Sequence, residues 1–385
     1  MYLLKLLIKN AFRHKLRTGL TILGITIAIL AFGLLRTVVS AWYSGVEGSS
    51  STRLITRNAV SLIFPLPISY RDRIRQVSGV TAVGSGDWFG GVYITEKNFF
   101  PNFAVDGKTY LDLYPEFILP PEQRKAFLAD RKGCIAGRKV AEQFGWRIGD
   151  AIVLKGTIFP GKWEFTLRGI YRGAGKNTDE TQFFFHWQYL NESLKKTAPQ
   201  RADHAGFYVV GLRDPEQAAP ISASIDLLFK NSLAETLTET EKAFQLSFVS
   251  MTDAIITVIQ VVSVIIIVII MAVMANTMAM TARERMSEYA VMKTLGFSAY
   301  HIGGLLFGES LVISAIGCAF GMALTFPAAR WFSDAMGTYL PVFNVEPQTL
   351  AMDVLAAAII GATAAAFPTW RAVTGSIAEG LRRIG

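Results

Sequence analysis

The sequence predicts a membrane protein with four transmembrane helices and an α+β extracytoplasmic domain between helices 1 and 2. Of its 385 residues, 51% are hydrophobic, and the mean hydropathy of +0.34 is too high for an ordinary soluble protein. The charged share of 18% is too high for a chain embedded throughout. A segment of about 210 residues separates the first two apolar runs, which is enough for one or two domains.

Four apolar runs are each long enough, at about 1.5 Å rise per residue, to cross a hydrocarbon core of roughly 30 Å. These spans are expected over 18–40, 253–280, 301–330 and 350–368. The other expected segments are an amphipathic N-terminal helix over 1–17, the α+β domain over 41–252, a loop with a short helix over 281–300, an outer loop over 331–349 and a tail over 369–385.

The net charge of +8 is concentrated on one side of these spans. Residues 1–17 hold five cations and no acid, residues 281–300 hold three cations and two acids, and residues 369–385 hold three cations and one acid. Cation-rich loops stay on the cytoplasmic side, and a nucleic-acid patch would be distributed differently. The pattern predicts a multi-pass protein of the bacterial inner (plasma) membrane with both termini cytoplasmic and no nucleic-acid partner.

The N-terminal span has an alternative interpretation as a cleaved signal peptide. A basic region precedes the apolar run, and residues 39–41 resemble a cleavage site. However, the run of about 22 residues exceeds the 7–15 residues of a typical signal-peptide core. A retained first span is therefore favoured.

The third span contains two motifs for close helix packing. Gly304 and Gly308 form one GxxxG step, and Gly317 and Gly321 form another. Such steps let a second helix approach closely, either from the same bundle or from a second copy of the chain. The sequence leaves both alternatives open.

A carboxyl group, Glu309, lies next to Gly308 in the same span. An acid inside a membrane is costly unless it faces protein or a wet cavity, so Glu309 is a candidate site residue. It could also lie close enough to the cytoplasmic interface to be hydrated. Both interpretations remain open.

The segment between the first two spans has a mixed α and β pattern. Residues 151–154 and 163–170 have the composition of strands and are joined by a turn containing Pro160 and Gly161, which predicts a hairpin. Helical spacing predicts three helices, over 138–144 with Gly145 as its end, over 216–229 and over 232–246.

The turn of that hairpin has the glycine and lysine spacing of a phosphate-binding loop, from Gly156 to Lys162. Trp163 stands where such a loop needs Ser or Thr for Mg²⁺, and the lysine precedes a strand rather than a helix. A hairpin turn is the better interpretation. The chain is therefore not expected to be an ATPase, and ATP and Mg would be bound by a partner.

Other catalytic signatures are missing from the sequence. It contains neither HExxH nor GxSxG, and its four histidines are scattered. Cys134 lies in a polar stretch and Cys318 in an apolar run, so both are expected to be unpaired. The chain is expected to be neither an enzyme nor a holder of a metal or cofactor.

The loop after the second span predicts a short amphipathic helix over 281–296. No Pro or Gly interrupts it before Gly296, and Glu284 and Glu288 fall on one face. The mixed apolar and charged side chains suit a groove on another protein. They would equally suit the surface of anionic lipid.

Several further segments at the ends of the spans carry a family pattern: 10–18, 276–278, 283–285, 288–296, 309–311, 368–373 and 376–381. In these segments the chain resembles the MacB-like and FtsX-like ABC transporter permeases, which include the MacB-type and lipoprotein-releasing permeases and work by mechanotransmission (type VII). Residues 134–150 are similar to the MacB-type periplasmic core.

The resemblance implies that the 281–300 loop is the coupling helix that seats in an ATPase subunit. The implied contact residues are Arg283, Glu284, Arg285, Met286, Glu288, Lys293 and Gly296.

The implied function is that of a permease that transmits ATP-driven movement to its periplasmic domains and exports or extracts an amphiphile such as a lipid, lipoprotein, peptide or drug. The alternative is an FtsX-like scaffold that activates a periplasmic partner. The implied partners are an ABC ATPase dimer, a second permease copy or paralogue, a periplasmic adaptor and membrane lipids.

Overall fold

The computed structural model describes residues 7, 9–336 and 342–374. They form two compact units. The membrane unit contains the described residues of 1–40, 253–336 and 343–385, and the α/β domain contains those of 41–252 and 337–342.

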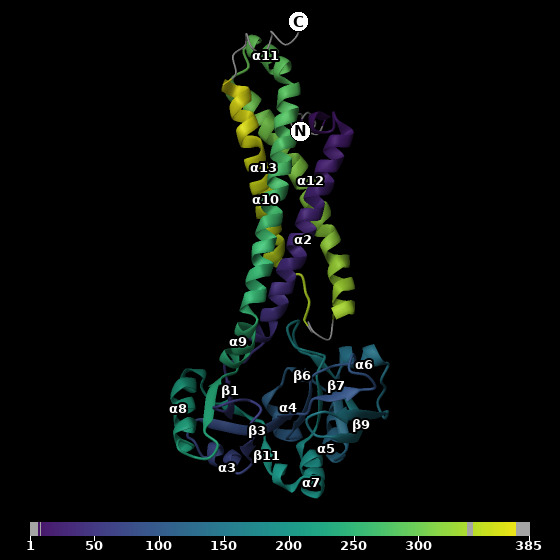
Figure 1. The fold of residues 1–385 in the computed structure, drawn as a ribbon, viewed down its shortest axis with the longest axis vertical. Helices are drawn as coiled ribbons and strands as arrows, with labels where there is room; N and C mark the ends of the chain where they lie inside the picture. Colours follow the sequence, from purple (N-terminus) through teal and green to yellow (C-terminus); the bar gives the residue numbers. More distant parts are fainter. Residues whose placement is uncertain (1–6, 8, 337–341, 375–385) are drawn as a thin grey trace. The chain divides into compact units, whose positions relative to one another are not determined.

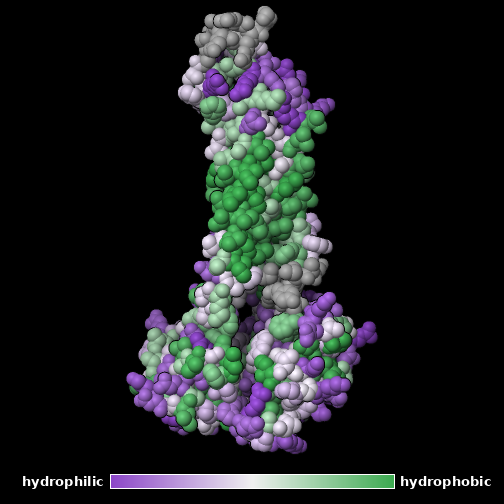
Figure 2. Space-filling view, viewed as in Figure 1, coloured by the Kyte–Doolittle hydropathy of each residue, from purple (hydrophilic) through white to green (hydrophobic). Residues whose placement is uncertain are grey.

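Four helices in the described part of the chain are long and apolar enough to cross a membrane. They are α2 (Lys15–Glu47), α10 (Asp253–Glu284), α12 (Ala299–Met336) and α13 (Pro347–Thr374), shown in Figure 1. Figure 2 shows apolar side chains in a band around the middle of these helices. With an α/β domain between the first two, they confirm the predicted fold class.

The helices extend beyond the predicted spans. Lys15 to Arg17 of the predicted N-terminal helix belong to α2, residues 7 and 9–11 are also helical, residues 12–14 form a turn, and residues 1–6 and 8 lie outside the described residues. The same is true of residues 375–385 in the predicted tail and of 337–341 in the predicted outer loop.

The second GxxxG step packs against α2 of the same chain. A Cβ on Gly317 would lie 2.7 Å from Ile25, and a Cβ on Gly321 would lie 2.7 Å from Ile29. The hydroxyl of Thr26 also donates to the carbonyl of Gly317 at 3.3 Å. Any larger residue at either glycine would push α2 and α12 apart.

The first GxxxG step behaves differently. A Cβ on Gly308 would lie 2.8 Å from Leu7, whereas a Cβ on Gly304 would have no described atom within 4 Å. Packing within the chain therefore accounts for three of the four glycines.

The described part of the α/β domain contains a mixed sheet of eleven strands. Their order is β13-β1-β12-β3-β5-β10-β7-β9-β8-β4, with β6 paired to β9. The strands are β1 (Arg53–Asn58), β3 (Val80–Trp88), β4 (Gly91–Tyr93), β5 (Asn102–Val105), β6 (Phe117–Ile118), β7 (Gly133–Gly137), β8 (Ala151–Gly156), β9 (Gly161–Gly173), β10 (Phe183–His186), β12 (Phe207–Leu212) and β13 (Thr236–Thr240). A separate pair joins β2 (Leu66–Pro67) to β11 (His204–Ala205).

Short helices pack on this sheet. They are α3 (Tyr70–Arg75), α4 (Gly107–Leu113), α5 (Pro121–Ala129), α6 (Arg138–Phe144), α7 (Trp187–Thr197), α8 (Ala218–Leu228) and α9 (Glu241–Met251), with 3₁₀ turns η1 (Pro199–Arg201) and η2 (Pro215–Gln217).

The predicted hairpin is confirmed. β8 and β9 pair antiparallel with Gly156 opposite Gly161, so the segment with phosphate-loop spacing is a hairpin turn. Alternate side chains of β9 are buried, including Trp163, Phe165 and Leu167, as its period-2 pattern requires.

Two of the three predicted helices are also confirmed, since α6 ends at Gly145 with a φ of 67° and α8 lies within 216–229. The helix predicted over 232–246 is right only in its second half, which belongs to α9 from Glu241 onward. Its first half forms β13, because the Thr236 and Thr238 hydroxyls donate to Asp226 of α8 at 2.8 and 2.7 Å while the strand pairs with β1. Its alternating threonines fit a strand better than a helix.

Both cysteines are buried and free of disulfides, as expected. Cys134 lies on β7 in an aromatic-rich core with Phe165, Phe183 and Phe185. Cys318 lies on α12 in the core of the helix bundle.

Candidate functional site

The loop after α10 folds into a separate short helix, α11 (Met286–Thr294), at one end of the bundle (Figure 1). The predicted start at Thr281 is wrong, because α10 continues to Glu284 and the chain breaks at Arg285. The predicted stop is confirmed. Gly296 has a φ of 90° and its amide donates to Lys293, while the Phe297 amide donates to Met292, which is the Schellman pattern.

Both glutamates of the predicted polar face pair with arginines near the start of α2, Glu284 with Arg17 of α2 and Glu288 with Arg13 of the segment before it. Arg17 donates to the two Glu284 carboxylate oxygens at 2.7 and 2.8 Å. Arg13 donates to Glu288 at 2.5 Å, and the charges of its partners help to lower the pKa of that partly buried carboxyl against the opposing effect of burial. The His14 ring lies 3.7 Å from Glu284. The two acids therefore face the same side of the chain, although they lie on two helices and not on one face of a single helix as predicted.

Arg285 links α11 to the third span. Its guanidinium donates to Glu309 of α12 at 2.8 Å and to Glu288 at 3.2 Å. Arg285 is 5% exposed and Glu309 is 4% exposed, so the pair is buried. Of the two interpretations of Glu309, the structure favours contact with protein over hydration at an interface.

The far end of α11 is tied to the fourth span. The Lys293 ammonium donates to the Val373 carbonyl of α13 at 2.9 Å. Tyr289 packs beside Arg285 in a small apolar cluster with Ile302 and Ala372, and burial raises the pKa of its hydroxyl to about 12. Contacts from one short helix thus reach α12, α13 and the segment before α2.

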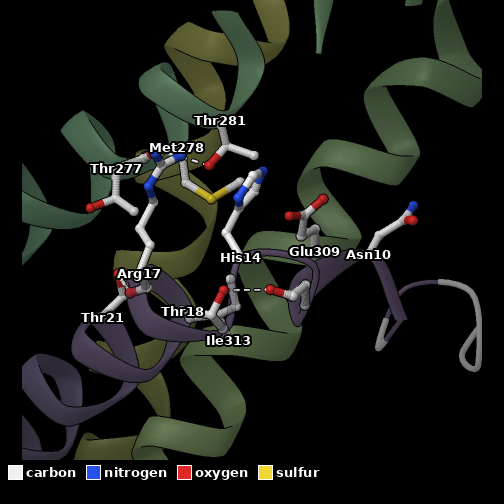
Figure 3. A pocket seen from close by; sticks show the side chains of 11 residues that line it. Asn10, His14, Arg17, Thr18, Thr21, Thr277, Met278, Thr281, Glu309 and Ile313 are labelled. Atoms are coloured by element: carbon white, nitrogen blue, oxygen red, sulfur yellow. Dashed lines mark hydrogen bonds between the residues drawn. The ribbon is translucent and has the colours of Figure 1, made fainter. Parts of the chain in front are cut away.

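A cavity of about 10 Å³, room for about one water molecule, lies beside these ion pairs. Figure 3 shows His14 and Arg17 from the N-terminal segment, Thr281 from α10 and Glu309 from α12 around it. The cluster is therefore tightly packed and polar, and movement of one member must displace the others.

The predicted contact residues fall into two groups. Arg283, Glu284 and Gly296 are exposed, and Met286, Glu288 and Lys293 are partly buried. Arg285 is buried and paired within the chain, so its role is internal, whereas an ATPase contact by the others stays a prediction.

Sequence reasoning missed an exposed apolar patch on and just after α11. Its members are Val291, Leu295, Phe297 and Tyr300, which are 45%, 72%, 47% and 87% exposed. The signal was available, because these apolar residues lie between two spans in an otherwise charged loop. We call them the α11 patch.

A second candidate site is a cavity of about 1180 Å³ in the α/β domain. Its lining combines aromatic and charged side chains. They include Trp88, Phe103, Tyr110, Tyr114, Phe117, Phe207, Phe244, Phe248, Arg53, Asp87, Glu116 and Glu241. Large apolar walls with few convergent polar groups are typical of small-molecule sites.

Arg53 organises one wall of this cavity. Its guanidinium donates to Glu241 at 2.8 Å and to both oxygens of Glu116 at 3.0 and 2.6 Å, and it stacks 4.1 Å from the Tyr114 ring centre. Burial lowers the pKa of Arg53, but the two carboxylates outweigh this effect and raise it. Arg53 begins the strand that follows α2, and Glu241 begins the helix that precedes α10.

Asp87, another lining residue, should make the stability of the α/β domain depend on pH. Asp87 is 8% exposed, and burial raises its pKa to about 7, against a smaller lowering by the Gly206 amide. The unfolded value is about 3.9, so the folded state binds the proton more tightly and loses stability as pH rises from about 4 to 7, by about 1.4 kcal/mol per pH unit.

Thermal unfolding of the purified full chain at several pH values checks this expectation. Asp87→Asn should flatten the decline between pH 4 and 7, whereas Asp72→Asn, at an exposed acid, should leave it unchanged. An unchanged slope in the Asp87 variant would show that this carboxyl titrates normally.

Comparison with known proteins covers both units. A family model described as FtsX-like permease C-terminal matches residues 260–377, and a MacB-like periplasmic core domain matches residues 18–228, more than half of the chain. An uncharacterized ABC transporter permease of Methanocaldococcus jannaschii is 24% identical over 337 residues, 82% of this chain and 80% of that protein.

Two solved structures are similar to part of the chain. The periplasmic region of MacB from Actinobacillus actinomycetemcomitans has 10% identity and a TM-score of 0.39, covering 53% of this chain and 95% of that one. The extracellular domain of the noncanonic ABC-type transporter YknZ from Gram-positive bacteria has 12% identity and a TM-score of 0.36, covering 49% and 100%. On the family matches, the chain belongs to the FtsX-like and MacB-like family of ABC transporter permeases.

Proposed function

We propose that this permease couples ATP hydrolysis by a separate ATPase subunit to movement of its α/β domain, and so exports or extracts an amphiphile. The observation that carries the proposal is α11, whose contacts reach α12, α13 and the segment before α2. A force applied to α11 would be passed to three helices at once, because packed helices and buried ion pairs resist gradual deformation.

The positive charge of residues 1–17 and 281–300 supports a cytoplasmic position for α11 and the N-terminus. The α/β domain then lies on the other side of the inner membrane. ABC ATPases work as pairs, so we propose that two permease copies, or this chain and a paralogue, bind one ATPase dimer.

The α11 patch is the proposed contact with the ATPase. Its four large apolar side chains are exposed, and α11 lies at one end of the bundle (Figure 1), in the part of the sequence that is rich in cations. A compact exposed apolar patch with a polar rim is typical of a protein interface. Arg283 and Glu284 would belong to that rim.

Leu295→Glu should therefore reduce binding of the ATPase by about 30-fold, because a central apolar anchor contributes roughly 2 kcal/mol. The measurement is co-purification of the ATPase with the tagged full-length permease, followed by titration of the purified subunits in nanodiscs. The matched control is Leu233→Glu, at an even more exposed leucine of the α/β domain.

If Leu295→Glu binds the ATPase as tightly as the wild type does, the α11 patch is not part of the interface. If no ABC ATPase co-purifies with the wild type, the coupling proposal itself fails. If α11 instead rests on lipid, the permease should bind anionic vesicles, and Leu295→Glu should weaken that binding.

The cavity in the α/β domain supports an amphiphile as the transported substrate. Aromatic rings would cover an apolar chain, and Arg53 with the acids Asp87, Glu116 and Glu241 would face a polar head group. A signalling scaffold needs no such cavity. An ATP-dependent release of fluorescent phospholipid from proteoliposomes is the test, and ATP hydrolysis with no release of any amphiphile would favour the scaffold.

A further inference from the structure

Asp353 is a buried carboxyl group in the membrane unit with no hydrogen-bond partner. It lies in the second turn of α13 and has no exposed surface. Neither of its carboxylate oxygens has a partner among the described residues. Buried polar side chains in folded proteins are nearly always hydrogen-bonded, so this exception needs an explanation.

The neighbouring polar groups cannot neutralise a carboxylate here. One carboxylate oxygen and the Thr325 hydroxyl of α12 lie 3.1 and 3.2 Å from the position that a Cβ on Gly33 of α2 would occupy. However, the Thr325 hydroxyl donates to the Gly321 carbonyl at 2.9 Å. The Cys318 thiol of α12 donates to the backbone carbonyl of Asp353, at 3.7 Å, and not to its side chain.

The helix α10 brings no charge to Asp353 either. α10 packs against α13 and has no titratable residue between Asp253 and Arg283. An ionised carboxylate in such surroundings would be far more costly than the neutral acid, which loses only a hydrogen bond. Such surroundings favour the protonated acid over the carboxylate.

A second unpaired group lies one turn away. Arg36 is on α2, three residues after Gly33, and its buried Nε has no acceptor in the described chain. Residues three apart on a helix are neighbours, roughly 5–6 Å apart at Cβ, and an arginine side chain is longer than that. A modest shift between α2 and α13 would bring the guanidinium to Asp353.

The other carboxyl group inside a span shows the contrast. Glu309 on α12 is equally buried but receives a 2.8 Å hydrogen bond from Arg285. Among the described residues, Glu309 is thus a buried acid with a cationic partner and Asp353 is a buried acid without one.

We propose that Asp353 is an intramembrane proton-binding site. It holds a proton in the packing of α2, α12 and α13 described above, and it releases this proton to water when the Arg36 guanidinium replaces it. The O–H bond of the acid breaks, the proton leaves as hydronium, and the carboxylate forms an ion pair with Arg36. Movement of α2 against α13 is thereby linked to uptake and release of one proton.

The test is labelling of the purified full-length permease in nanodiscs with dicyclohexylcarbodiimide, an apolar reagent that attacks protonated carboxyl groups. Peptide mass spectrometry should find the adduct on Asp353 and none on Glu309. Asp353→Asn should abolish the adduct, Glu309→Gln should leave it, and Arg36→Gln should raise the labelling rate several-fold because no cation then competes with the proton.

An infrared measurement gives an independent readout of the same proton. The difference between the wild-type and Asp353→Asn spectra should contain the carbonyl band of a protonated carboxylic acid, whereas any band from Asp87 is common to both proteins and cancels. Absence of both the adduct and the band would overturn the proposal, as would equal labelling of Asp353 and Glu309. Equal labelling rates in the wild type and Arg36→Gln would overturn the part assigned to Arg36.

Discussion

Arg285→Met is expected to destabilise the membrane unit by roughly 3–5 kcal/mol, because it leaves the Glu309 carboxylate buried and without its partner. The same variant should uncouple the permease. α11 would lose its ion pair to α12, so ATP hydrolysis by the bound ATPase would no longer drive release of amphiphile. Thermal unfolding of the purified full chain and transport per ATP hydrolysed are the two measurements.

A double variant shows whether the stability is lost with the ion pair itself or because one charge is left buried without a partner. The double variant Arg285→Met with Glu309→Leu removes both charges and should recover most of the stability, since a buried ion pair is often replaced by apolar residues at little cost. It should remain uncoupled if the ion pair transmits force. Arg283→Met, at an exposed arginine nearby, is the control. An equal loss of stability and of transport in that variant would show that the buried ion pair of Arg285 is not the cause.

The spans and their order could be predicted from the sequence because a membrane demands long apolar helices. Local signals also placed the hairpin of β8 and β9 and the helix that Gly145 ends. The first half of the helix predicted over 232–246 was wrong because its helical spacing competed with a partner distant in the sequence. β13 adds to the edge of the sheet at β1, and only the folded sheet supplies that edge.

The position of the candidate site in the chain could be predicted from the sequence, but its side-chain contacts could not. The charge pattern and the Glu284 and Glu288 spacing identified the loop after α10. Neither could reveal that Arg285 turns inward to Glu309, since that contact depends on how α12 packs. The unpaired state of Asp353 is likewise invisible in sequence, because it reflects the commitment of Thr325 and Cys318 to other acceptors.

Arg53→Met should destabilise the α/β domain by roughly 3–5 kcal/mol, because Glu241, at 6% exposure, would lose its buried partner. The change would also remove one side-chain link between the strand that follows α2 and the helix that precedes α10, which Arg53 and the Ser50 amide join through Glu241. Thermal unfolding of the full chain, followed by tryptophan fluorescence, measures the loss.

Arg57 on the same strand provides the control. It pairs with Glu239 at 3.1 Å, but both side chains are more exposed, at 17% and 20%. Water weakens such a pair, so Arg57→Met should cost about 1 kcal/mol or less. If both variants lose the same free energy of unfolding, the ion pair of Arg53 contributes no more than an exposed one. A larger loss at Arg53, with ATPase binding intact and release of amphiphile abolished, would show that the domain must be held by both chain connections to move as one body.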